Sequence, residues 1–176
     1  MTGTRITIPT LETKRLRLRA PEFRDFDSFA AFRASPRAVH VGGPHDRDQA
    51  FNQLCALIGH WQLRGYGRWI VADRETDEAL GTTGPYYPEG WYAPEIAWSV
   101  FDRAEGRGIA YEAAQAARAY AYDVLGWTTV VSLVTPENTR SAALAQRMGC
   151  VRDGTFEHES IGPLHIWRHP SAEALA

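Results

Sequence analysis

The clearest pattern near the start of the chain is a strict alternation of charged and apolar residues. Residues 15–19 read Arg-Leu-Arg-Leu-Arg, which predicts a strand with one buried face. Other short segments are rich in apolar or β-branched residues and are bounded by polar, glycine or proline positions. We expect strands there too, at residues 68–73, 79–84, 95–101, 128–134, 151–157 and 164–168.

Further segments repeat apolar residues at steps of three and four, the spacing of one helical face. Asp25 or Asp27 can cap the first of these helices, and Pro36 stops it. The expected helices contain residues 26–32, 46–64, 109–125 and 138–148. The residues expected on the buried faces of the long helices are Phe51, Leu54, Cys55, Ile58 and Trp61 on one, and Ile109, Ala113, Ala116, Tyr120 and Val124 on the other.

The predicted elements follow the order βααβββαβαββ. The central strand–helix–strand segment, residues 95–134, has to be a parallel and right-handed crossover. The flanking hairpins are antiparallel. We therefore expect a single α/β domain (α+β in its arrangement) over residues 1–176, with a mixed, mostly antiparallel, twisted sheet. The ends, residues 1–10 and 170–176, are expected to be flexible.

Composition narrows the class of protein. The net charge of -2 and the mixing of both signs along the chain give no footprint for nucleic acid. No apolar run is long enough to span a membrane, so we expect a cytoplasmic protein. Cys55 and Cys150 are too few for a zinc site and are expected to be buried free thiols. We expect no metal, because the histidines near the end of the chain show no metal-ligand spacing and are expected at the surface: His158, His165 and His169.

The stretch with the most chemical information is 105–113, Glu-Gly-Arg-Gly-Ile-Ala-Tyr-Glu-Ala, between a predicted strand and a predicted helix. Gly106 and Gly108 permit a sharp turn that brings backbone N–H groups to a ligand. The helix behind them adds its free N–H groups and the positive end of its dipole, which together favour phosphate. Arg103 and Arg107 are candidate partners for the phosphate oxygens. The alternative is a tight turn with solvent-facing arginines.

This stretch resembles the acetyl-CoA loop of the GNAT superfamily, with Gly108 and Ala110 on its two small positions. The version in ribosomal-protein N-terminal acetyltransferases is similar at Gly106, Gly108, Ala110, Glu112 and Ala113. Glu105 departs from the family pattern, and we expect its side chain to point outward. Other segments also resemble the family: 11–19, 94–100, and 138–141 with 148–150.

The resemblance implies a GNAT fold, acetyl-CoA as donor and an amine as acceptor. It implies that Glu95 is the general base, direct or through water, and that a backbone N–H near Ser99 or Val100 binds the oxyanion. Ser141 is the implied donor of a proton to the leaving thiolate. Asn138 can bind the pantetheine amides or only cap its helix. The implied cofactor loop contains Arg103, Gly106, Arg107, Gly108, Ile109 and Ala110.

The loop predicted over residues 85–94 is dense in aromatic residues: Tyr86, Tyr87, Trp91 and Tyr92. Exposed aromatic groups favour a substrate wall or a contact in a homodimer, whereas the plain alternative is a cluster that packs on itself. Two functional alternatives to the acetyltransferase stay open. One is a CoA-binding sensor or interaction module without turnover, and the other is a nucleotide- or phosphate-binding protein that uses the same loop.

Overall fold

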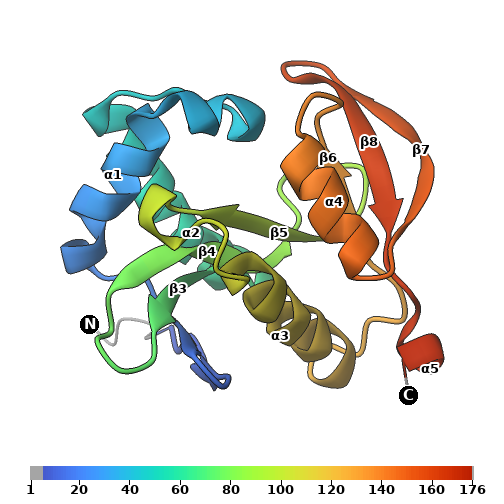
Figure 1. The fold of residues 1–176 in the computed structure, drawn as a ribbon, viewed down its shortest axis with the longest axis horizontal. Helices are drawn as coiled ribbons and strands as arrows, with labels where there is room; N and C mark the ends of the chain where they lie inside the picture. Colours follow the sequence, from blue (N-terminus) through green and yellow to red (C-terminus); the bar gives the residue numbers. More distant parts are fainter. Residues whose placement is uncertain (1–5, 176) are drawn as a thin grey trace.

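A single mixed sheet forms the centre of the computed structural model, which describes residues 6–175. Its strand order is β1-β2-β3-β4-β5-β6-β8-β7, and β5–β6 is the parallel pair among antiparallel neighbours (Figure 1). The predicted fold class and the central crossover are therefore confirmed. The strands are β1 (Leu11–Glu12), β2 (Leu16–Arg19), β3 (Trp69–Asp73), β4 (Ala79–Tyr86), β5 (Glu95–Val100), β6 (Val131–Val134), β7 (Val151–His158) and β8 (Gly162–Arg168).

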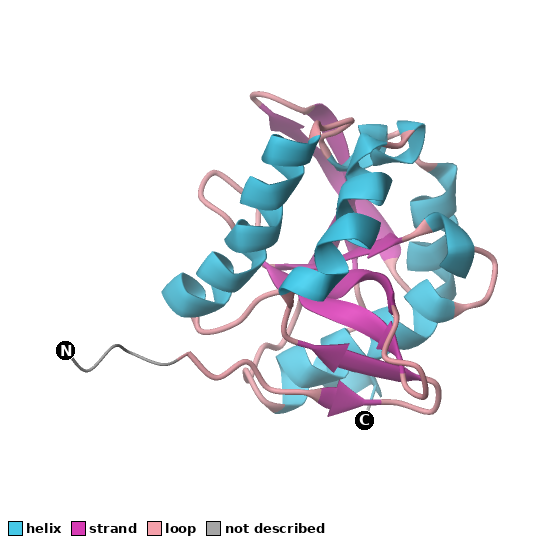
Figure 2. Cartoon of the chain, turned by 90° about the vertical axis from the view of Figure 1, so that its left-hand side faces the viewer, coloured by secondary structure: helices cyan, strands magenta, loops and turns pink. Residues whose placement is uncertain are grey.

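Helices cover both faces of this sheet (Figure 2). Helices α1 and α2 pack on one face, and α3 and α4 pack on the other. The bounds are α1 (Phe26–Ala34), α2 (Arg47–Arg64), α3 (Ile109–Asp123), α4 (Thr139–Arg147) and α5 (Ala172–Leu175). Short 3-10 helices are η1 (Phe23–Asp25), η2 (Pro36–Val41) and η3 (Asp102–Ala104).

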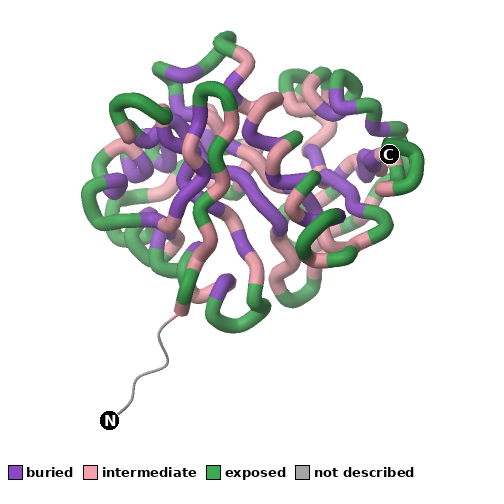
Figure 3. The backbone as a smooth tube through the Cα atoms, turned by 90° about the horizontal axis from the view of Figure 1, so that it is seen from below, coloured by how far each residue is buried: buried purple, intermediate pink, exposed green. Residues whose placement is uncertain are grey.

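The two faces of the sheet bury separate apolar clusters, which follow from the alternation of side chains along each strand. In β3, Trp69 and Val71 belong to the cluster under α3, whereas Ile70 and Ala72 belong to the cluster under α1 and α2. Trp61 and Trp69 are both buried, as expected. Their rings meet edge to face at 5.0 Å. Figure 3 shows the buried backbone running through the middle of the molecule, with exposed segments around it.

The buried faces of the long helices differ in part from the expected ones. In α2 the buried residues are Ala50, Leu54, Leu57 and Trp61, so the expected set was wrong at Phe51, Cys55 and Ile58, which are exposed. The small Ala50 occupies the contact, and Phe51 lies beside it with its ring against Phe26 at 5.4 Å. In α3, Ile109 and Ala113 are buried, but Val124 is 64% exposed because the helix already ends at Asp123.

Strands β5 and β6 diverge almost as soon as they meet, and this divergence positions the site. Their only register pair in the described chain is Glu95 with Val131. Beyond it, the Ser132 hydroxyl donates to the Ile96 carbonyl at 2.7 Å and so replaces a ladder hydrogen bond. His169 Nε2 lies 2.9 Å from the same hydroxyl. His169 is 2% exposed, so the expected surface position was wrong: the residue follows β8, which lies next to β6.

The ends of the described chain contact the core. The Trp69 indole N–H donates to the carbonyl of Pro9 at 2.7 Å, and Ile6 and Ile8 pack against the cluster under α3. Near the other end, Tyr122 donates to the carbonyl of Pro170 at 2.8 Å. The remaining residues of the ends expected to be flexible, 1–5 and 176, lie outside the described residues. No helix within residues 6–175 has both the length and the apolar character needed to cross a bilayer.

Candidate active site

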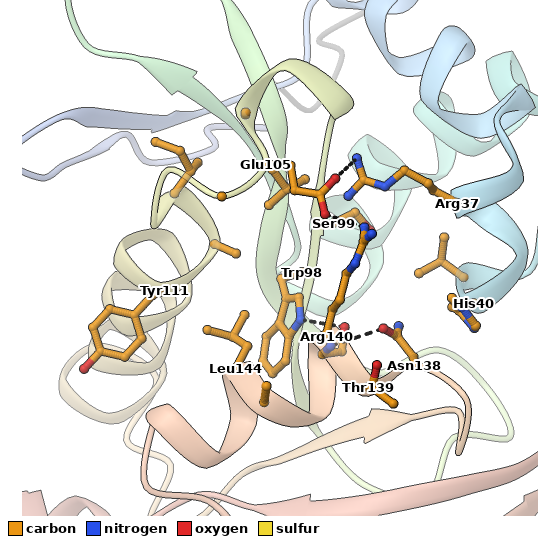
Figure 4. Close-up of a pocket in the computed structure, with 18 of the residues that line it drawn as sticks. Arg37, His40, Trp98, Ser99, Glu105, Tyr111, Asn138, Thr139, Arg140 and Leu144 are labelled. Atoms are coloured by element: carbon orange, nitrogen blue, oxygen red, sulfur yellow. Dashed lines mark hydrogen bonds and ion pairs between the residues drawn. The ribbon is translucent and has the colours of Figure 1, made fainter.

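A cavity of about 700 Å³ lies beside β5, on the side from which β6 diverges. Its walls are the first residues of α3, helix α4 from its first residues onward, η2, and the edge of β5 that faces away from β4 (Figure 4). Because both α3 and α4 begin here, two helix N-termini with their free backbone N–H groups and positive dipole ends line one space. Such an arrangement favours an anionic ligand.

The glycine turn before α3 has the backbone conformation that its sequence predicts. Gly106 and Gly108 have φ angles of 72° and 75°, values that residues with a Cβ seldom adopt. Gly108 is the N-cap of α3, and Gly106, Gly108, Ile109 and Ala110 all line the cavity. The turn therefore presents main chain to the cavity, with small groups at the point of closest approach.

Asn138 and Ser141 meet at the start of α4. Asn138 Oδ1 accepts from the backbone N–H of Ser141 at 3.1 Å, so it caps the helix, and both residues line the cavity. The Ser141 Oγ accepts from the Trp98 indole N–H at 3.2 Å (Figure 4). That bond uses a lone pair of the hydroxyl and leaves its proton available to a group in the cavity.

The backbone of β5 decides which of its N–H groups can reach the cavity. The Ile96 carbonyl points toward β6, since it accepts from Ser132, whereas the Phe101 N–H bonds to Leu80 of β4. Successive residues of a strand alternate their N–H and C=O directions. The N–H of Val100 therefore points to the cavity edge and that of Ser99 points to β4. Both residues line the cavity.

Glu105 lies across the mouth of the cavity, so the expectation that its side chain points outward was wrong. Its carboxylate pairs with Arg37 of η2 at 3.1 Å and with Arg140 of α4 (Figure 4). Arg37 also pairs with Asp102 at 2.6 Å. Two arginines from distant parts of the sequence draw the carboxylate inward. Neither arginine was among the expected site residues, because nothing local relates residue 37 or 140 to residue 105.

Arg103 and Arg107, the expected phosphate partners, lie away from this cavity. Arg103 bonds to the Glu78 carboxylate at 2.9 Å and to the Ala79 carbonyl at 2.7 Å, which hold its guanidinium against the β3–β4 hairpin. Arg107 lines a smaller depression with Lys14 and Arg15, on the other side of the glycine turn. In the cavity itself, Arg37 and Arg140 supply the arginine side chains, together with Arg147.

Glu95 is buried at the start of β5, on the sheet face that carries α1 and α2, and does not line the cavity. Its Oε2 accepts from the backbone N–H of Leu133 at 2.9 Å. Burial raises the pKa of this carboxyl to about 7, against the opposing effects of the Leu133 bond, the Arg68 charge and the Trp91 indole N–H. A carboxyl with that pKa can accept a proton near neutral pH. Ser99 points to the same face and does line the cavity.

The aromatic residues of segment 86–92 pack on one another and on neighbouring strands. Tyr86 ends β4 and meets the Trp91 ring at 5.7 Å. Trp91 also meets His158 at 5.3 Å, and the exposed Tyr92 lies 5.7 Å from Phe156. The Tyr87 N–H donates to His60 Nε2 at 3.1 Å. None of the four lines the cavity, so a role in substrate binding or in a homodimer stays a prediction.

Another contact across the cavity has no signal in the local sequence. His40 Nδ1 of η2 lies 3.1 Å from the Thr135 hydroxyl at the end of β6, so the two walls touch. Only the long-range fold brings these residues together. Within residues 6–175 no group of three or more His, Cys, Asp or Glu side chains is arranged to hold a metal ion. Of the two free cysteines, Cys150 is buried as expected and Cys55 is exposed.

Comparison with known proteins agrees with this fold. Residues 15–151 match the family model described as the acetyltransferase (GNAT) domain. A crystal structure of an acetyltransferase from Agrobacterium tumefaciens superimposes with a TM-score of 0.85 at 35% identity, covering 97% of this chain and 99% of that one. The uncharacterised N-acetyltransferase p20 of Bacillus licheniformis is 29% identical over 82% of this chain and 84% of its own length.

A third similar protein is RimL, a ribosomal L7/L12 alpha-N-protein acetyltransferase solved in complex with coenzyme A. It has a TM-score of 0.75 and 15% identity, covering 92% of this chain and 97% of that one, and it shows a likeness of fold alone. The family match over residues 15–151 establishes more. This chain belongs to the GNAT acetyltransferase family. It is an acyltransferase, and the resemblance noted in the sequence is confirmed.

Proposed function

We propose that this chain transfers an acetyl group directly from acetyl-CoA to a primary amine. The observation that carries the proposal is the cavity into which two helix N-termini and the glycine turn open, beside the free edge of β5. GNAT acetyltransferases use acetyl-CoA as donor, and the backbone cradle of Gly106 to Ala110 fits the phosphates of such a molecule. Asn138 is then available at the helix start to meet the amides of its pantetheine arm.

The transfer needs an uncharged amine, and Glu95 supplies the base. Its carboxyl has a pKa raised to about 7 by burial, so it is partly ionised at neutral pH and can take a proton from an ammonium group, directly or through water. The amine nitrogen then bonds to the acetyl carbon. The backbone N–H of Val100 is oriented to stabilise the negative charge on the carbonyl oxygen in that transition state.

The leaving sulfur needs a proton when the carbon–sulfur bond breaks. Ser141 lines the cavity, and its hydroxyl keeps its own proton because it accepts from Trp98. We assign to Ser141 the donation of that proton to the thiolate. The nitrogen loses its second proton to solvent as the tetrahedral intermediate collapses to the amide. Ser141 is reprotonated from solvent and Glu95 releases its proton to solvent, so the cycle balances as acetyl-CoA plus an ammonium group giving CoA, the N-acetylated amine and one proton.

A CoA-binding module without turnover is the second candidate, and one observation favours it. Glu95 does not line the cavity and already holds Leu133, a structural role that needs no catalysis. The presence of both Glu95 and Ser141 favours the enzyme. Near-neutral net charge gives no preference for a nucleic-acid or strongly charged partner.

Thermal unfolding with acetyl-CoA, ATP and NAD in parallel tests the donor. A ligand at about 100 times its dissociation constant adds about 2.7 kcal/mol, a rise in Tm of about 5–11 °C for a domain of this size. We expect that rise with acetyl-CoA alone, and thiol release once a suitable amine is added. A Tm unchanged at saturating acetyl-CoA contradicts the proposal. A rise without thiol release on any amine favours the module.

A further inference from the structure

Buried N–H groups without acceptors gather beside Glu95. The described residues contain four buried side-chain atoms that lack a hydrogen-bond partner: Arg33 Nε, Arg68 Nε, Trp91 Nε1 and Trp167 Nε1. The first three surround one another on the sheet face that carries α1 and α2, as the following contacts show. A buried donor left unpaired costs free energy. The Trp91 N–H lies close enough to the Glu95 carboxyl to stabilise its charged form, so the two arginine Nε atoms are the donors that point to a missing acceptor.

The Tyr86 ring is the centre of this group. The Arg68 guanidinium carbon lies 4.4 Å from its centroid, and the Trp91 ring meets its edge at 5.7 Å. His60 stacks on the same ring at 5.3 Å. Glu95 is the register partner of Tyr86 in the β4–β5 pair, so both side chains point to one face. The carboxyl and the Arg68 guanidinium are therefore neighbours.

Arg33 lies between this group and the cavity. It is 5% exposed, and its guanidinium donates to the Val41 carbonyl at 3.0 Å and lies 3.1 Å from His45 Nδ1. Val41 itself lines the cavity. Burial and the nearby Arg68 charge lower the pKa of Arg33 to about 10. Neither Arg33 nor Arg68 forms an ion pair with any carboxylate of residues 6–175.

This sheet face runs along β5 to the cavity. Glu95, Ala97 and Ser99 follow one another on the same side of β5, and Ser99 lines the cavity. Ala97, between them, is partly exposed and has a small side chain.

We propose that Arg33 and Arg68 bind the carboxylate of a small amino acid whose amine faces Glu95. Two neighbouring guanidinium groups whose Nε atoms lack acceptors favour a further anion, and a planar guanidinium suits a planar carboxylate. Because Arg68 and Glu95 are neighbours, the anion and the amine belong to one small molecule and are separated by few bonds. A protein N-terminus carries no carboxylate so close to its amine. The assignment rests on the proposed acetyl transfer and names its acceptor.

Matched pairs of acceptors test the assignment. Thiol release from acetyl-CoA is measured with free L-alanine, L-leucine, L-phenylalanine and L-lysine, with the corresponding amino acid amides, and with a peptide that has a free N-terminus and an amidated C-terminus. The amide has the less basic and more reactive amine, so a preference for the acid reports recognition of its carboxylate. We expect kcat/KM for at least one acid to exceed that for its amide by about 10–100-fold.

Variants localise the effect. Arg68→Gln removes a guanidinium that forms no hydrogen bond through its Nε, so we expect it to fold. It should raise KM for the acid by about 10–100-fold. Because the Arg68 charge also lowers the pKa of Glu95, the two substrates are compared above pH 8, where turnover of the amide should change much less than turnover of the acid. Arg68→Lys should restore part of the loss. The matched control is Arg47→Gln, at an exposed arginine on α2 that pairs with Asp27. It should leave kcat and KM unchanged for both the acid and the amide.

Several outcomes overturn the assignment. One is equal or better turnover of the amides or the peptide by the wild type. Another is an equal loss for acid and amide in Arg68→Gln. A third is thiol release from the peptide or the amides with none from any amino acid. These three leave acetyl transfer intact. Absence of thiol release with every amine removes the proposed function as well, which distinguishes the two failures.

Discussion

The carboxylate of Glu95 accepts a hydrogen bond from the backbone N–H of Leu133 at 2.9 Å, so one side chain joins β5 to β6. The proposed base thus also fastens the two strands at the point where they diverge. Any test of its chemistry has to preserve that bond. Glutamine does so, because its carbonyl oxygen can accept from Leu133 while its amide cannot take a proton.

Glu95→Gln is therefore expected to fold and to lose activity. Removing a positioned general base lowers the rate by about 10²–10⁴-fold. In the wild type, kcat/KM should rise with pH through about 7, the pKa to which burial raises this carboxyl. The variant should lack that limb of the profile. Thiol release between pH 5.5 and 9 checks both expectations, and Glu95→Gln at wild-type activity contradicts the assignment of the base.

The same raised pKa predicts how stability depends on pH. The folded protein holds the Glu95 proton up to about pH 7, whereas the unfolded chain releases it near 4.5. The protonated Glu95 carboxyl therefore contributes fully to the free energy of unfolding at low pH. That contribution, about 3 kcal/mol, is lost as pH rises from about 4.5 to 7. Urea unfolding at pH 5 and pH 8 should show that Glu95→Gln gains free energy of unfolding relative to the wild type at the higher pH. An unchanged difference would mean that the carboxyl is not buried in solution.

Local patterns predicted most of the elements, because periodicity, caps and turn residues act within a few positions. Asn138 shows this: a cap predicted from its place before an apolar helix accepts from Ser141 three residues later. Long-range pairing was beyond the sequence. The insertion of β8 between β6 and β7 buries His169, and η2 brings Arg37 to Glu105. No nearby position in the sequence signals these long-range contacts. The side chains of His169 and Glu105 were therefore expected at the surface.

Glu105→Gln should strengthen donor binding. The carboxylate occupies Arg37 and Arg140 at the mouth of a cavity that we assign to a polyanionic donor. Loss of one negative charge there releases both guanidinium groups, and a charge-assisted bond is enough for about a 3–10-fold lower Kd for acetyl-CoA. Isothermal titration at two salt concentrations measures it. The control, Glu159→Gln, removes a charge from the exposed β7–β8 turn and should have no effect. Weaker binding by Glu105→Gln would contradict the repulsion argument.

Ser141→Ala should separate binding from turnover. The hydroxyl is the proposed proton donor to the thiolate, so we expect kcat to fall by about 10–100-fold with the donor Kd nearly unchanged. The change also leaves the Trp98 indole N–H without its acceptor, which costs about 1 kcal/mol of stability. Thiol-release kinetics and denaturant unfolding measure the two effects. A normal kcat in Ser141→Ala assigns the proton to water or to another group.

His169 predicts a loss of stability in acid. Burial and the Arg118 charge lower its pKa to about 3, so the folded state keeps it neutral while the unfolded chain binds a proton near 6.5. The neutral His169 therefore contributes fully to the free energy of unfolding above pH 6.5. That contribution, about 4–5 kcal/mol, is lost as pH falls toward 3. Denaturant unfolding at pH 7.5, 5.5 and 4.5 tests this. His169→Gln should give a shallower slope over that range, and an equal slope would refute the assignment.

The single register pair between β5 and β6 has a further consequence for how the molecule opens. The sheet consists of two plates, β1–β5 and β6–β8–β7, which share little main-chain pairing and are joined chiefly by side chains such as Glu95 and Ser132. Each plate should then exchange its amide hydrogens as a separate cooperative unit. A molecule seated in the cavity contacts β5 of the first plate and α4, the helix that joins β6 to β7 of the second. Its binding energy would merge the two units into one and slow exchange in parts of the chain that it never contacts.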